Sequence, residues 1–93
     1  MTKELRSVQD VLADQFRITA ELSALTGEYH RLLQKVAASA FTRQMAEDQP
    51  GPELAQAERA EIAAKLTAET CELKIRDLEG HLSALGRELA SLK

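Results

Sequence analysis

The sequence is poor in the residues that build β-sheets. Only 3% of its 93 residues are aromatic and there is no Trp, while Val and Ile occur three times each. β-Branched and aromatic side chains favour strands, whereas Ala and Leu, which supply nearly all of the apolar content here, favour helices. The composition therefore argues against a sheet and predicts an all-α protein.

Other absences narrow the class of protein further. A single cysteine excludes an internal disulfide and favours a reducing compartment, so we expect a cytoplasmic protein. No apolar run approaches the roughly 20 residues that a membrane span needs, and we expect no charged-then-apolar leader. Neither sign of charge dominates, since 12 Lys and Arg face 15 Asp and Glu. Such a balance gives no excess of positive charge that would attract nucleic acid or an anionic membrane, so we expect neither as the main partner.

Proline and glycine are scarce, and the one strong helix-breaking segment is Asp48-Gln49-Pro50-Gly51-Pro52. Pro50 disfavours helix at the residue before it, Gly51 gives the backbone freedom, and Pro52 suits the first turn of a new helix. This punctuation predicts a single domain, 1–93, that consists of a helix over about 3–47, a turn at 48–52 and a helix over about 53–92.

Apolar residues in the second predicted helix recur in alternating steps of three and four, the spacing of a coiled-coil seam. The members of this seam are Ile75, Leu78, Leu82, Leu85, Leu89 and Leu92. The same register continued toward the turn gives smaller or charged residues, namely Cys71, Ala68, Ala64, Glu61 and Ala57. We expect large side chains of the facing helix to fill the space beside the small ones.

The first predicted helix has apolar residues in the same stepping. They are Ile18, Leu22, Leu25, Tyr29, Leu32 and Val36. A second stripe lies upstream and is displaced around the helix; its members are Leu5, Val8, Leu12 and Phe16. The displacement predicts a slip of register between Gln15 and Thr19. Thr2 is the expected N-cap of this helix.

A short turn makes consecutive helices antiparallel neighbours. We therefore predict a long antiparallel helical hairpin, a two-helix coiled coil about 60 Å in length at 1.5 Å per residue. Folding about the turn should place Leu33 and Val36 opposite Cys71 and Ala68, large side chains against small ones.

The predicted hairpin leaves apolar side chains uncovered, because Ile62, Leu66 and Leu73 project away from its seam. Burying one such side chain is worth about 1.5–3 kcal/mol, and small chains often complete a core by oligomerising. We therefore expect a homodimer that forms a four-helix bundle, although a different protein partner would bury the same surface. The alternative is a break in the first helix near residues 37–42, which would give a monomeric three-helix bundle.

Few residues offer chemistry. Asp77 and His81 have the spacing of two metal ligands on one helix face, but no second pair completes a di-metal site. Cys71 fits a buried apolar filler, and Tyr29 fits either a core ring or an interface anchor. The sequence has no glycine-rich phosphate loop, CxxC motif or Ser/His/Asp set. We expect no enzyme, no cofactor and no bound metal.

The sequence thus predicts a non-enzymatic protein–protein interaction module, such as an adaptor, small chaperone, assembly factor or inhibitory subunit, that acts through exposed apolar helix faces. The residues expected at the partner or dimer interface are Phe16, Leu25, Leu32, Phe41, Met45, Ile62, Leu66 and Leu73.

Two alternatives belong to other classes of protein. The first is a nucleic-acid-binding dimer that uses basic residues of the first helix, which are Arg6, Arg17, Arg31, Lys35 and Arg43. Nearby acidic residues weaken the positive electrostatic potential of these side chains, so a solvated surface of mixed charge is the default interpretation. The second is a metal or thiol sensor that uses His81, Asp77 and Cys71.

Overall fold

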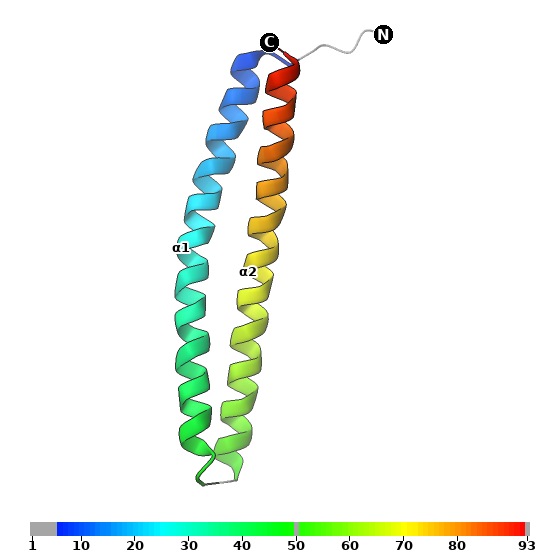
Figure 1. The fold of residues 1–93 in the computed structure, drawn as a ribbon. Helices are drawn as coiled ribbons and strands as arrows, with labels where there is room; N and C mark the ends of the chain where they lie inside the picture. Colours follow the sequence, from blue (N-terminus) through cyan, green and yellow to red (C-terminus); the bar gives the residue numbers. More distant parts are fainter. Residues whose placement is uncertain (1–5, 50, 93) are drawn as a thin grey trace.

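The computed structural model describes residues 6–49 and 51–92 and contains two long helices that pack against each other. Helix α1 spans Val8–Ala46 and helix α2 spans Pro52–Ser91. They run side by side in opposite directions, and the start of α1 and the end of α2 lie at the same end of the molecule (Figure 1). The predicted all-α hairpin is confirmed, and its longest dimension is 68 Å.

The first helix begins later than the sequence suggested, at Val8 instead of about residue 3. Ser7 is its N-cap: the Ser7 hydroxyl accepts a hydrogen bond from the Asp10 amide at 3.1 Å. The Asp10 carboxylate in turn accepts one from the Ser7 amide at 3.3 Å. This reciprocal capping box satisfies two helix-end amides and fixes the start of α1. Thr2, the expected cap, lies outside the described residues.

Helix α1 runs without a break from Val8 to Ala46, through residues 37–42. The alternative of a three-helix bundle was therefore wrong. Residues 37–42 contain no Pro or Gly, so nothing in the backbone chemistry interrupts the helix there. Within the described ranges, neither helix has a stretch both long and apolar enough to cross a membrane.

Two apolar clusters hold the helices together. The cluster near the chain ends consists of buried Val11, Ile18 and Leu85 with partly buried Leu22, Leu78, Leu82, Leu89 and Leu92 around them. The cluster in the middle consists of buried Leu32, Ala68 and Cys71 with Leu25, Tyr29, Val36 and Ile75 around them. We call the line of contact formed by these residues the seam. It uses the three-and-four stepping that the sequence predicted for both helices.

The predicted slip of register between Gln15 and Thr19 was wrong. Val11 is fully buried beside Ile18, seven residues later, so the seam keeps one register along this part of α1. Three of the residues that suggested the slip, Val8, Leu12 and Phe16, face solvent instead, and Phe16 is 77% exposed. The fourth, Leu5, lies outside the described residues. An i,i+4 run of apolar residues looks like a buried stripe in the sequence, but the facing helix decides which stripe is covered.

The expected pairing of large with small side chains is present, but one of the large residues differs from the expected one. Leu32, not Leu33, packs with Val36 against Ala68 and Cys71. Leu33 lies beside the seam and is 41% exposed. Because side chains on neighbouring positions of a helix do not face the same way, only one of the two leucines can enter the seam.

Candidate interaction surface

The seam changes character between the middle of the hairpin and the turn. The central cluster ends at Val36 on α1 and Ala68 on α2. Among the described residues closer to the turn, the buried ones are Ala57 and Glu61. This part of the helix–helix contact is therefore closed by small and charged side chains, with no large apolar residue buried in it.

An ion pair crosses the seam in this region. The Arg43 Nε donates a hydrogen bond to Glu61 Oε1 at 2.8 Å, and the same guanidinium bonds Glu47 one turn along α1. Only 11% of the Glu61 side chain and 25% of the Arg43 side chain are exposed. A charge-assisted contact this sheltered from water fixes the relative position of the two helices.

Four large apolar residues of the same region lie on the outside of the hairpin, whereas Leu54 is half-buried. Phe41 and Met45 on α1 are 63% and 61% exposed, and Ile62 and Leu66 on α2 are 59% and 58% exposed. The usual arrangement of an amphipathic hairpin, with apolar side chains inside and polar ones outside, is thus reversed near the turn. Such exposed apolar side chains are typical of surfaces that another protein covers.

Leu73 extends this apolar surface along α2 and is 63% exposed. Ile62, Leu66 and Leu73 follow one another in steps of four and seven residues, which places them on one side of the helix. Their neighbours Ala68 and Cys71 are buried in the seam, so this side faces away from α1. We call Ile62, Leu66 and Leu73 the outer stripe.

The remaining predicted interface residues lie elsewhere. Phe16 is exposed near the far end of α1, whereas Leu32 is 9% exposed and, with Leu25, belongs to the central cluster. These two leucines contact α2 and complete the hairpin's own seam, so we leave them out of the candidate surface. The structure keeps the other six predicted residues exposed.

Three exposed apolar residues were missing from the predicted interface set. Val8, Leu12 and Leu33 are 40%, 39% and 41% exposed. Leu12 and Leu33 each follow a seam residue directly in the sequence, which places them at the edge of the contact. That position is the signal that could have identified them.

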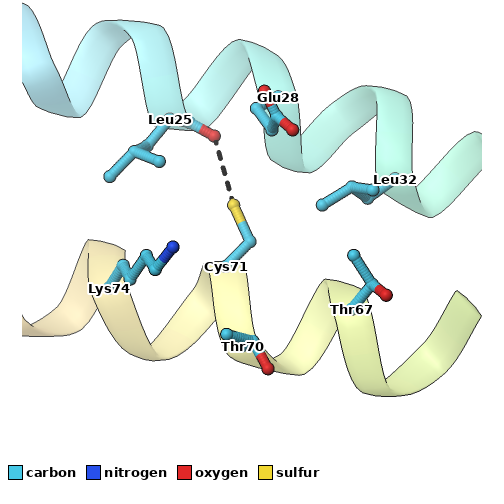
Figure 2. A pocket seen from close by; sticks show the side chains of 7 residues that line it. All are labelled: Leu25, Glu28, Leu32, Thr67, Thr70, Cys71 and Lys74. Atoms are coloured by element: carbon cyan, nitrogen blue, oxygen red, sulfur yellow. Dashed lines mark hydrogen bonds between the residues drawn. The ribbon is translucent and has the colours of Figure 1, made fainter. Parts of the chain in front are cut away.

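A shallow groove of about 380 Å³ runs beside the central cluster. Figure 2 shows Cys71 in its wall, with Lys74 reaching in from α2 and Glu28 from α1. The Cys71 thiol donates a hydrogen bond to the Leu25 carbonyl oxygen at 3.6 Å and is buried. Its role as a packing residue is confirmed.

Tyr29 combines a packed ring with a polar tip. The ring lies against the central cluster, and the hydroxyl donates a hydrogen bond to Glu72 Oε2 at 2.8 Å. This bond to a carboxylate, together with partial desolvation, raises the pKa of the Tyr29 phenol above its usual value of 10.0. Of the two expected roles, the structure confirms the core ring.

The basic residues expected to contact a nucleic acid are mostly neutralised by carboxylates. Arg6 pairs with Asp14 at 2.6 Å and with Glu88 of α2 at 3.3 Å. The hydrogen bond from Arg6 holds the pKa of Asp14 below its usual value of 3.8. Arg17, Arg31 and Arg43 form the remaining contacts, with Asp14, Glu21, Glu28, Glu47 and Glu61. A surface so paired offers little net positive charge to a nucleic acid.

The two histidines are exposed. His81 Nε2 lies 3.8 Å from Asp77 Oδ1 one turn away. Within residues 6–49 and 51–92, no three His, Cys, Asp or Glu side chains come together in a way that could hold a metal ion.

No protein-family model matches this chain, and neither a curated protein nor a solved structure was found to be similar to it. The geometry of the hairpin therefore carries the functional argument alone.

Proposed function

We propose that this protein is a non-enzymatic interaction module of a reducing compartment such as the cytoplasm. Its exposed apolar helix faces dock on a protein surface, and the first such surface is a second copy of the same hairpin, with which it forms a four-helix assembly. A module of this kind acts as an adaptor, a small chaperone, an assembly factor or an inhibitory subunit, through helix packing and without chemistry.

The observation that carries the proposal is the reversed amphipathicity near the turn. Helices in a protein that works as a monomer place their large apolar residues inside. Here Arg43 and Glu61 occupy the inside of the turn-proximal region, and Phe41, Ile62 and Leu66 occupy the outside. This distribution is expected where the outer surface of the hairpin becomes buried when the protein assembles with a partner.

The energetic scale supports association. The three large apolar side chains of the outer stripe are 58–63% exposed, so a symmetric dimer that packs through this stripe brings six of them together. Full burial of one such side chain is worth about 1.5–3 kcal/mol, so the remaining burial of the six is worth about 5–11 kcal/mol in total. Association itself costs about 4 kcal/mol or more. The upper end of the gain exceeds the lower end of this cost by about 7 kcal/mol, which corresponds to a Kd of about 10 μM, so we expect association at tens of micromolar.

The experiment that tests the proposal compares solution mass before and after a charge is placed in the outer stripe. Light scattering of the unmodified chain should give twice its mass of 10.3 kDa. Leu66→Asp should shift the mass toward that of a monomer while most of the helical circular dichroism remains, because Leu66 makes no seam contact.

The matched control is Ser23→Asp, which adds the same charge at an exposed position of α1, away from the outer stripe. It should leave the dimer intact. A dimer that tolerates Leu66→Asp as well as it tolerates Ser23→Asp would contradict docking through the outer stripe.

A further inference from the structure

We infer that the second copy binds along α2 in antiparallel orientation, with Ile62 of each chain opposite Leu73 of the other. The inference rests on the proposed self-association and specifies its surface and register. In a two-fold symmetric dimer, when residue i of the first chain contacts residue j of the second, residue j of the first chain also contacts residue i of the second. The outer stripe meets this requirement, since its two ends are large apolar residues with Leu66 between them.

The surface area favours a second chain over a lone hairpin. The chain exposes 7107 Å², whereas a compact monomer of 10.3 kDa exposes about 5,400 Å². The proposed register overlaps about 32 residues of each α2, a contact about 48 Å long and about 10 Å wide. It covers about 500 Å² of each copy and about 1,000 Å² in total, the lower bound for a specific interface.

Charges beside the outer stripe complement one another in this register. Lys65 and Glu69 are exposed and form no ion pair with a described residue. Antiparallel packing with Ile62 opposite Leu73 brings Lys65 of one chain beside Glu69 of the other, and symmetry repeats the contact. Complementary charges at such flanking positions select register and orientation in helix pairs.

The ends of the overlap follow the same rule. The register places Glu58 near Arg76 of the second copy and Arg59 near Asp77 of the second copy. Arg59 also approaches Arg76, but Glu72 already offsets the charge of Arg76 at 2.6 Å. In this register Arg59, Lys65 and Arg76 thus each have a carboxylate of the second copy within reach.

Cysteine cross-linking tests the register directly. The variants are Ile62→Cys and Leu73→Cys, each in a Cys71→Ala background that removes the natural thiol. When the two variant chains are mixed and mildly oxidised, a disulfide should join them. Neither variant alone should cross-link, because identical positions lie about 16 Å apart in the antiparallel pair, far beyond the reach of about 7 Å between Cα atoms of a disulfide.

Each outcome has a distinct meaning. A cross-link confined to the mixture supports the antiparallel register. If the unmodified chain is a dimer but the mixture fails to cross-link, or each variant cross-links with itself, the register is wrong and the proposed self-association stands. A monomeric mass for the unmodified chain overturns both.

A charge reversal gives an independent test. Lys65→Glu should weaken dimerisation about tenfold, because two attractive contacts per dimer become repulsive. The double variant Lys65→Glu with Glu69→Lys should restore it. The control Lys35→Glu makes the same charge change at an exposed position of α1 and should change dimerisation much less. Failure of the double variant to recover affinity would overturn the register.

Discussion

The Arg43–Glu61 ion pair allows the most detailed prediction, because its two members are unequally buried. Removing one partner of a fully buried pair costs about 3–5 kcal/mol. A quarter of the Arg43 side chain remains in water, so we expect Arg43→Ala to lower the free energy of unfolding by about 2 kcal/mol, less than that range. The cost arises because the variant leaves the Glu61 carboxylate in the seam without its cation.

Glu61→Ala should cost much less, about 0–1 kcal/mol. Arg43 keeps its contact with Glu47 in this variant, and Ala is a good helix former that suits a seam already lined by small residues. The double variant Arg43→Ala with Glu61→Ala should be more stable than Arg43→Ala and cost about 1 kcal/mol, because it leaves no unpaired carboxylate in the seam. The coupling energy between the two positions is then about 1–2 kcal/mol.

The assay is chemical denaturation followed by circular dichroism, at one fixed protein concentration because the proposed dimerisation would add to apparent stability. Lys35→Ala serves as the control, since it removes an exposed cation of α1. If Arg43→Ala and Glu61→Ala cost equal amounts and their effects simply add, the seam ion pair does not lock the two helices and the reasoning is refuted.

Three further predictions concern single contacts. Ser7→Ala removes the cap of α1 and should lower the free energy of unfolding by about 1 kcal/mol; an unchanged denaturation midpoint would count against the cap. Tyr29, the one tyrosine, should ionise above pH 10.0 in an ultraviolet titration. The stability that its phenol contributes should be lost as the pH rises through this raised pKa, and Glu72→Gln should lower the midpoint of the tyrosine ionisation again. Asp14 has a lowered pKa, so its pairing with Arg6 stabilises the fold above about pH 4 and is lost in stronger acid; the difference in melting temperature between the unmodified chain and Arg6→Ala should shrink there.

Local chemistry was enough to predict the hairpin and most of its seam. The Pro50-Gly51-Pro52 segment marks the turn, and leucine spacing in α2 marks the buried side of that helix. Both signals depend only on residues that are close together in the sequence. Glu61 was correctly placed in the seam by the same spacing.

Contacts between distant residues could not be read in this way. Val8, Leu12 and Phe16 form as regular a stripe as the seam itself, and only the packing of Val11 with Leu85 decides that the stripe stays in solvent. The partner of Glu61 comes from the other helix, so helix spacing could not reveal it.

The candidate surface was predicted in part for the same reason. The outer stripe was recognisable because it lies opposite the seam of its own helix, and the structure exposes all three of its residues. Leu25 and Leu32 were assigned both to the seam and to the partner interface, because a seam residue and a partner-facing residue have the same apolar chemistry in the sequence. The packing of α2 against them places them in the seam.

The most direct measurement of the central claim is the mass of the unmodified chain in solution across the micromolar range, by sedimentation equilibrium. Association through the exposed apolar surface predicts a mass that rises with concentration from 10.3 kDa toward twice that value. A mass that remains at the single-chain value throughout would contradict it.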